Sequence, residues 1–229
     1  MYGVMPAGRE QMARSPVMDL PAMDMDAPAY DAVLCDFDGV VNLWDPDGMT
    51  ALDRSWGLAE GTLAAVAFEA GLLEAAVTGH LSDEQWRRRV ADGLAPACGS
   101  VGRARDLVAA WSALTGRVDT EVVALLAALR GTVPVVLVSN ATTRLETYLA
   151  AVGLAEAFDA VVSSARIGVA KPDPRVFTTA AGRAGAEPRR CLFVDDSPGN
   201  VTAARAVGMA GLHYRHIGQL REAVAPLLG

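Results

Sequence analysis

Two aspartates separated by a single residue follow an apolar run near the start of the sequence. The run begins at residue 32, and Asp36, Asp38 and Gly39 end it. Residues two apart on an extended chain share a face, so both carboxylates can point into one crevice. Gly39 would let the chain turn sharply after them. A pattern this short also arises by chance, and a capped turn is the simpler alternative.

A second acidic pair follows another apolar run. Asp195 and Asp196 come directly after residues 191–194 and are followed by Ser197. One of these acids could cap a helix, but a cap would account for only one of the two. Four carboxylates at two strand ends repel one another unless a hard cation lies among them. Mg²⁺ suits oxygen ligands and often takes one or two carboxylates plus a substrate phosphate, so we expect Mg²⁺ here.

Two further segments carry groups that suit a phosphate. Ser139 and Asn140 end an apolar run, and a hydroxyl with free backbone N–H groups can bind a phosphate oxygen. A helix N-cap remains an equal alternative for this pair. Lys171 is the only lysine beside nineteen arginines, and Pro172 and Pro174 constrain its loop. A compact ammonium there could neutralise both a phosphate and a nearby carboxylate nucleophile.

These segments need strands and helices to position them. Apolar runs predict strands over residues 32–39, 135–138, 158–163, 191–194 and 212–214. Helices are predicted over 119–130 with Gly131 as terminator, over 142–152, from 174, over 198–207, and up to 227. Strands that alternate with helices indicate a parallel sheet covered on both faces. Ligands of such sheets bind beyond the carboxyl ends of the strands, where the polar segments lie.

Between the first two strands lies a long stretch that is helical throughout. It spans about residues 50–115, with a helix start predicted at Ser82 and a joint at 93–102. The basic run at residues 87–89 is predicted to be a solvated helix face.

Composition excludes several functional classes. The 229 residues carry a formal charge of −7, which argues against a nucleic-acid partner. No apolar run is long enough to span a bilayer, and residues 1–30 read as a flexible tail without the order of a signal peptide. The three cysteines have no zinc or disulfide spacing, so a cytoplasmic location is expected. We expect a monomer or homodimer without a membrane partner.

Taken together, the four polar segments resemble the haloacid dehalogenase superfamily. The resemblance rests on D-F-D-G-V at 36–40, S-N at 139–140, K-P-D at 171–173 and V-D-D-S-P-G-N at 194–200, and it covers about residues 31–215. It is strongest to phosphatase-like members with a helical cap after the first strand. The implied fold is α/β, with a Rossmann-like parallel sheet core and an inserted α-helical cap domain. The implied division is a core at 31–46 and 117–229 with a cap at 47–116, hinged near 42–47 and 116–119.

The resemblance also implies a role for each polar residue. Asp36 would be the nucleophile that forms an aspartyl-phosphate, and Asp38 the general acid and then the base. The substrate would be a small phosphorylated metabolite. Mg²⁺ would be held by the Asp36 carboxylate, the Asp38 backbone carbonyl and Asp196, with Asp195 assisting. The phosphoryl group would be bound by Ser139, the Asn140 backbone and Lys171.

Three alternatives to a phosphatase share this core. Dehalogenases of this superfamily lack an acid two residues after the nucleophile, so Asp38 favours phosphoryl transfer. A phosphosugar mutase would use the same core and remains an alternative, as does a non-catalytic binding module, although no catalytic residue is missing. Residues 40–44 are more apolar than in many such phosphatases, so the resemblance does not identify the substrate. Arg54, Trp56 and His80 could touch substrate, but no role is assigned to them.

Overall fold

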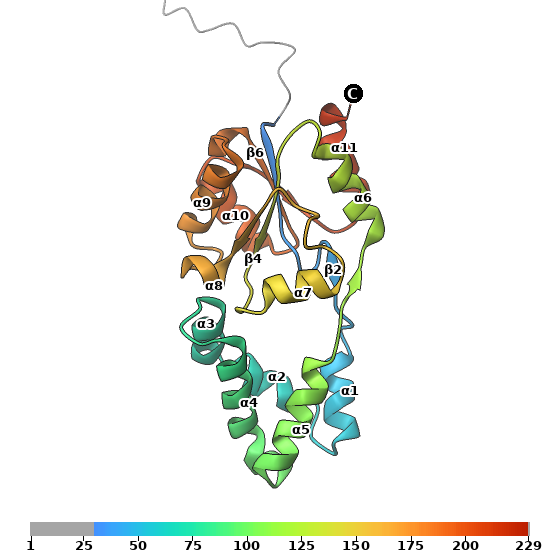
Figure 1. Cartoon of the computed structure of the whole chain (residues 1–229), viewed down its shortest axis with the longest axis vertical. Helices are drawn as coiled ribbons and strands as arrows, with labels where there is room; N and C mark the ends of the chain where they lie inside the picture. Colours follow the sequence, from blue (N-terminus) through green and yellow to red (C-terminus); the bar gives the residue numbers. More distant parts are fainter. Residues whose placement is uncertain (1–29, 229) are drawn as a thin grey trace, which may run out of the picture.

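The computed structural model describes residues 30–228, so the tail predicted at 1–30 lies almost entirely outside the described residues. A five-stranded parallel sheet, in the order β5-β4-β1-β6-β7, lies at the centre of the fold (Figure 1). The strands are β1 (Ala32–Cys35), β4 (Val135–Ser139), β5 (Ala160–Ser163), β6 (Cys191–Asp195) and β7 (Ala210–His213). The predicted α/β class with a parallel sheet is therefore confirmed.

Alternate residues of β1 enter two different hydrophobic cores. Val33 and Cys35 pack with α6 (Thr120–Leu129), α7 (Leu145–Ala151) and α11 (Ile217–Val224). Ala32 and Leu34 pack with α9 (Pro174–Ala184) and α10 (Pro198–Ala206) on the other face. Side chains of a strand point to opposite faces in turn, so an apolar strand needs helices on both sides. Figure 1 shows the two groups of helices flanking the sheet.

Local signals in the sequence set several helix starts. Asp119 accepts hydrogen bonds from two backbone N–H groups at the start of α6, as an N-cap does. Asp173 caps α9 by accepting from one backbone N–H, that of Arg175, and Pro174 takes the first position of the helix. The remaining short helices around the five-stranded sheet are α8 (Ser164–Ile167) and the 3₁₀ turns Pro188–Arg190 and Ala225–Leu227. Helix α6 ends at Leu129 with Arg130 as its C-cap, so Gly131 directly follows the helix end as predicted, although its φ is not positive.

Five helices between β2 and β3 form a separate cluster around their own core (Figure 1). They are α1 (Gly48–Ser55), α2 (Thr62–Ala67), α3 (Ala70–Val77), α4 (Asp83–Cys98) and α5 (Val101–Ser112). The helix start predicted at Ser82 is confirmed, since Ser82 and Gln85 form a capping box. Among the described residues, no helix is long and apolar enough to cross a membrane.

The chain enters and leaves this helical cluster through a small ribbon. Strands β2 (Asn42–Leu43) and β3 (Arg117–Val118) pair antiparallel. Sequence periodicity did not predict them, because two residues are too few to show an alternating pattern. The ribbon brings together the two segments for which hinges were predicted.

Two expectations about α4 hold only in part. The predicted joint at 93–102 is only a break at Gly99 and Ser100, because α4 continues through Gly93 and Pro96. Gly93 has a packing role instead, since a Cβ there would lie 2.8 Å from a methyl group of Val66 on α2. The basic run is not uniformly solvated either. Arg87 is partly buried, with its guanidinium 4.7 Å from the ring centre of Trp111.

Candidate active site

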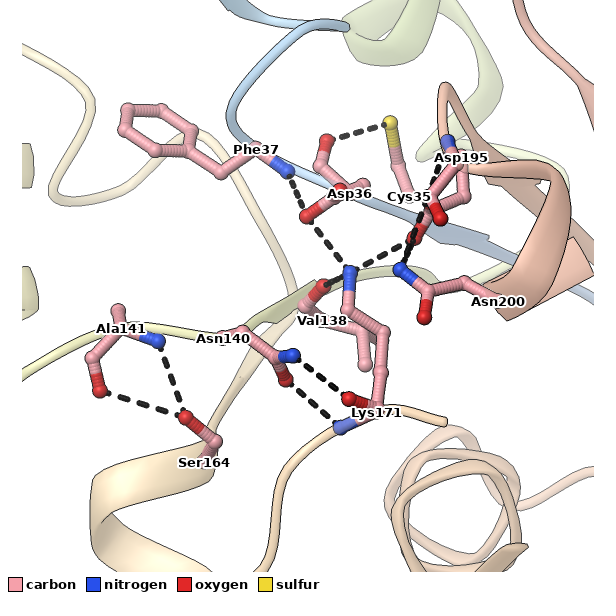
Figure 2. Close-up of polar contacts among 11 residues, drawn as sticks. Cys35, Asp36, Phe37, Val138, Asn140, Ala141, Ser164, Lys171, Asp195 and Asn200 are labelled. Carbon is pink, nitrogen blue, oxygen red and sulfur yellow. Dashed lines mark hydrogen bonds and ion pairs between the residues drawn. The ribbon is translucent and has the colours of Figure 1, made fainter. Parts of the chain in front are cut away.

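The polar segments predicted from the sequence converge at the carboxyl edge of the sheet. Asp36 follows β1, Ser139 ends β4 and Asp195 ends β6, while Lys171 arrives on the loop between α8 and α9. Because β1 lies between β4 and β6, the three strand ends are neighbours. Figure 2 shows Lys171 reaching from its loop toward Asp36 and Asp195. We call Asp36, Lys171, Asp195 and Asp196 the sheet-edge cluster.

The ammonium group of Lys171 occupies the centre of this cluster. Its Nζ lies 2.8 Å from Asp36 Oδ1 and 2.7 Å from Asp195 Oδ2, and it donates to the Val138 carbonyl at 2.9 Å. An ammonium has three donors, and each has an acceptor here. The Lys171 side chain is 1% exposed, so these contacts replace water. A cation with a fixed position is therefore built against the Asp36 carboxylate.

Asp195 is fully buried and already engaged at both oxygens. Besides Lys171 at Oδ2, its Oδ1 accepts from the Ser197 backbone N–H at 2.8 Å and from Asn200 Nδ2 at 3.1 Å. These bonds suit a carboxylate that orients Lys171. The sequence alone suggests no role for Asn200, although Asn200 ends the segment 194–200 that carries the family resemblance. Only the turn into α10 brings its amide back over Asp195.

Burial and charge shift the pKa of the two central groups. Burial raises the pKa of Asp36 to about 7, and Asp195 adds to this while Lys171 opposes it. Burial acts against the charged form of Lys171, but the carboxylates of Asp36 and Asp195 outweigh it, and the pKa of Lys171 is raised. Lys171 is thus held as a cation, whereas Asp36 needs further positive charge to ionise fully at neutral pH.

Asp196 completes a group of carboxylates that could hold a cation. One oxygen from each of Asp36, Asp195 and Asp196 can lie within 4.8 Å of the others. Gly39 leaves room for this approach, because a Cβ at that position would stand 2.2 Å from Asp196 Oδ2. Gly39 also has a φ of +80°, which other residues rarely adopt. The surplus of carboxylates over Lys171 and the all-oxygen donor set fit a hard divalent cation.

Asp38 lies beside this group with one oxygen held in place. Asn42 Nδ2 donates to Asp38 Oδ1 at 2.8 Å, and Trp44 Nε1 donates to the same atom at 2.7 Å. Neither donor could be predicted from the sequence, since nothing in the pattern of 40–44 indicates a polar contact. Both follow from the turn at Gly39, which brings the Gly39 N–H within 2.9 Å of the Asn42 carbonyl.

Asn140 holds the loop between α8 and α9, residues 168–173, which carries Lys171 and which we call the lysine loop. Its Oδ1 accepts from the Lys171 backbone N–H at 2.7 Å, and its Nδ2 donates to the Lys171 carbonyl at 2.8 Å (Figure 2). The N-cap alternative for Ser139 and Asn140 is wrong, because α7 begins only at Leu145 with Arg144 as its N-cap. Ser139 is buried at the end of β4 and lines the cavity described next.

A cavity of about 460 Å³ opens over these residues. Six of the seven predicted site residues line it, and the seventh, Asp195, lies buried behind them. The lining comprises Asp36, Asp38, Gly39, Leu43, Trp44, Ser139, Asn140, Lys171, Asp196 and Asn200. Arg54, Trp56 and His80 do not belong to it. His80 instead lines a second cavity, of about 700 Å³, between α3 and the lysine loop.

The match to known families agrees with this geometry. The family model described as "haloacid dehalogenase-like hydrolase" matches residues 30–208, which is more than half of the chain. The chain belongs to the haloacid dehalogenase-like hydrolase family. This membership confirms the resemblance inferred from the four motifs and makes the chain one of a family of hydrolases.

Individual family members are similar over shorter segments. Phosphatase MT3486 of Mycobacterium tuberculosis is 42% identical over 29% of this chain and 30% of its own length. The fructose-1-phosphate phosphatase YqaB of Escherichia coli is 39% identical over 31% of this chain and 37% of its own. The matches thus span well under half of these relatives.

A solved structure is similar over most of the chain. The family enzyme bt-2542 of Bacteroides thetaiotaomicron, in complex with magnesium and inorganic phosphate, superposes with a TM-score of 0.65. The superposition covers 81% of this chain and 94% of that one at 22% identity, so it supports the fold.

Proposed function

We propose that the protein is a magnesium-dependent phosphomonoester hydrolase that acts through an aspartyl-phosphate on a small phosphorylated metabolite. The observation that carries this proposal is the contact of Lys171 Nζ with Asp36 Oδ1 at 2.8 Å, with the Asp38 carboxylate lining the same cavity. A nucleophilic carboxylate, a fixed cation and a second carboxylate are the groups that phosphoryl transfer requires. The phosphatases among the relatives and the magnesium and phosphate bound to bt-2542 support it.

Asp36 is the proposed nucleophile. Its Oδ1 is held by the Phe37 backbone N–H at 2.7 Å and by Lys171, while no residue of 30–228 donates a hydrogen bond to Oδ2. The lone pairs of Oδ2 are therefore available to attack phosphorus. As the P–O bond to the alcohol breaks, Asp38 gives its proton to the leaving oxygen. The Asp38 carboxylate then takes a proton from the water that hydrolyses the aspartyl-phosphate.

Asp36 and Asp196, with the Asp38 backbone carbonyl, are the proposed ligands of Mg²⁺. We place Asp195 behind them, since both of its oxygens are engaged by Lys171, Ser197 and Asn200. Bound Mg²⁺ would offset the charge of the nucleophile and of the phosphate dianion. Ser139, Asn140 and Lys171 are the proposed contacts of the transferred phosphoryl group. We also propose that residues 47–116 act as a cap, and that the protein works in the reducing cytoplasm with three free, buried thiols.

The Asp36→Asn variant tests this proposal. The amide oxygen can still accept from Phe37 and Lys171, so the fold should persist, but the nucleophile is lost. We expect wild-type protein with Mg²⁺ to release phosphate from p-nitrophenyl phosphate and from members of a sugar-phosphate panel, and the variant to release none above background. Asp45→Asn is the matched control, because Asp45 is exposed and outside the cavity.

Four outcomes would contradict the proposal. Wild-type rates in Asp36→Asn would show that Asp36 is not the nucleophile. Phosphate release that persists unchanged after chelation of Mg²⁺ would show that the reaction does not depend on Mg²⁺. Halide release from a 2-haloacid without any phosphatase activity would make the protein a dehalogenase. A requirement for a sugar bisphosphate, with return of the phosphoryl group to sugar, would make it a mutase.

A further inference from the structure

We propose that Asn42, Trp44 and Tyr148 are positioning residues for Asp38, and that they leave Oδ2 as the oxygen that exchanges the proton with the leaving group. The inference rests on the acid and base role of Asp38 proposed above. It starts from the two N–H donors, Asn42 Nδ2 and Trp44 Nε1, that meet at the single atom Oδ1. Among the described residues, none donates to Oδ2.

The two donors decide which oxygen carries the acidic proton. A protonated carboxyl has one carbonyl oxygen and one hydroxyl, and two N–H groups aimed at one oxygen favour it as the carbonyl acceptor. The proton of Asp38 then sits on Oδ2. In the first step this O–H bond breaks as the alcohol oxygen leaves phosphorus and gains the proton. In the second step Asp38 Oδ2 accepts a proton from water as the water oxygen bonds to phosphorus and the bond between phosphorus and Asp36 Oδ2 breaks.

Tyr148 fixes the direction of the Asn42 amide. The Tyr148 hydroxyl accepts from the Gly116 backbone N–H at 2.9 Å and donates to Asn42 Oδ1 at 3.2 Å. With its oxygen engaged on that side, the amide turns its NH₂ group toward Asp38. Asn42 is fully buried, and a Cβ on Gly116 would stand 2.3 Å from its Oδ1, so the amide has little freedom.

Trp44 holds the same carboxylate from the open side. Trp44 is 46% exposed, and its ring stacks on the Tyr148 ring, with centroids 5.8 Å apart and planes at 29°. A tryptophan this exposed gains little from burial, so the stacking and the N–H bond to Asp38 account for its position. Asn42 lies in β2 and Gly116 precedes β3. The hydrogen bonds from Gly116 through Tyr148 to Asn42 therefore also link both connections to the helical cluster.

The Trp44→Phe variant separates proton transfer from the other steps. Phenylalanine can still stack on Tyr148 but lacks the N–H donor. The p-nitrophenolate ion leaves without a proton, whereas the alkoxide of glycerol 2-phosphate does not. We therefore measure kcat for both esters with Mg²⁺. The ratio of kcat for glycerol 2-phosphate to kcat for p-nitrophenyl phosphate should fall about tenfold in the variant.

Two further variants sharpen the test. Tyr148→Phe keeps the ring contacts with Phe37 and Trp44 and loses only the hydroxyl, so it should lower the same ratio by roughly threefold. Trp56→Phe is the matched control, because Trp56 packs against Arg103 in the helical cluster and does not line the cavity. Its ratio should equal that of the wild type. Circular dichroism and melting temperatures check that each variant is folded.

Asp38→Asn distinguishes failure of this inference from failure of the proposed function. If Asp38→Asn lowers the ratio and Trp44→Phe does not, the positioning role is wrong while the acid role stands. If neither lowers it, both are wrong. If the wild type with Mg²⁺ hydrolyses neither ester, the proposed function fails and this inference fails with it. A lowered ratio in both Asp38→Asn and Trp44→Phe, with the ratio of Trp56→Phe unchanged, supports the positioning role.

Discussion

The sheet-edge cluster has more carboxylates than its one cation can balance, whereas a second buried cluster at the start of α4 is balanced. We call Asp83, Arg87 and Thr142 the α4 cluster. Asp83 Oδ2 accepts from Arg87 Nε at 2.7 Å, and Asp83 Oδ1 accepts from Thr142 Oγ1 at 2.7 Å. One anion meets one cation and one hydroxyl there.

The difference in charge balance separates a site from a structural contact. At the sheet edge, Lys171 pairs with two aspartates, Asp36 and Asp195, and within the described part of the chain no second cation pairs with the neighbouring Asp196. These three aspartates form the one group of possible metal ligands found among residues 30–228. Excess charge that is buried costs free energy unless a ligand compensates it. In the α4 cluster, Arg87 and Thr142 already compensate the charge of Asp83. The contact between Asp83 and Thr142 joins α4 to the loop after β4. Burial of a carboxylate alone would not have distinguished the two.

The largest effect is expected from Lys171→Arg, which keeps the charge of the sheet-edge cluster but changes its shape. One nitrogen of Lys171 donates to three acceptors, and a planar guanidinium cannot converge three donors from one atom. We expect kcat/KM for p-nitrophenyl phosphate to fall about a thousandfold. Arg175→Lys is the control, since Arg175 is exposed nearby and pairs with Asp173. Near-normal kinetics of Lys171→Arg would mean that only the charge matters.

Gly39→Ala should have the next largest effect, and Gly57→Ala provides its counterpart in the helical cluster. Both glycines have positive φ, so each change costs about 1–2 kcal/mol of stability. Only at Gly39 would the new Cβ collide with Asp196, because a Cβ on Gly57 meets nothing within 4 Å. We expect turnover of Gly39→Ala to fall about a hundredfold. The rise in melting temperature on adding Mg²⁺ should also shrink, while Gly57→Ala retains it. Equal Mg²⁺ responses would exclude Asp196 as a ligand.

A smaller effect should appear in the pH dependence of stability without Mg²⁺. Burial raises the pKa of Asp36 from its ordinary value of 3.8 to about 7, so the fold favours the protonated form. The stability this contributes is full below about 4 and is lost as the pH rises through about 7. In EDTA, the melting temperature of the wild type relative to Asp36→Asn should therefore fall over that range. A constant difference would contradict the raised pKa.

The smallest effect on activity is expected from Asp83→Asn in the α4 cluster. The amide can still accept from Thr142 but loses its ion pair with the partly buried Arg87, which should lower the free energy of unfolding by about 1–3 kcal/mol. Well below the melting temperature, kcat should stay within about threefold of the wild type. Urea unfolding and kinetics on the same samples measure both, with the exposed Asp92→Asn on the same helix as control. A loss of activity as large as that of Lys171→Arg would erase the distinction between the clusters.

Much of the fold followed from local patterns. Apolar runs predicted all five strands of the main sheet, and Asp119, Ser82 and Pro174 marked helix starts that the structure confirms. Those signals act within a few residues, so they can be read without the tertiary structure. The β2–β3 ribbon could not be predicted, because it depends on pairing between segments more than seventy residues apart.

What the sequence by itself determined is the set of polar residues at the strand ends, including the only lysine, because strand ends and parallel topology bring them to one edge. The tertiary structure alone decided how deeply each of these residues is buried and which groups it contacts. It buries Asp195 behind Lys171 and leaves Asp196 exposed, a difference that two adjacent aspartates in a sequence do not reveal. It also brings Asn42, Trp44 and Tyr148 to Asp38, through contacts up to 106 residues apart. Such contacts depend on side-chain packing across the whole fold, which no local pattern encodes.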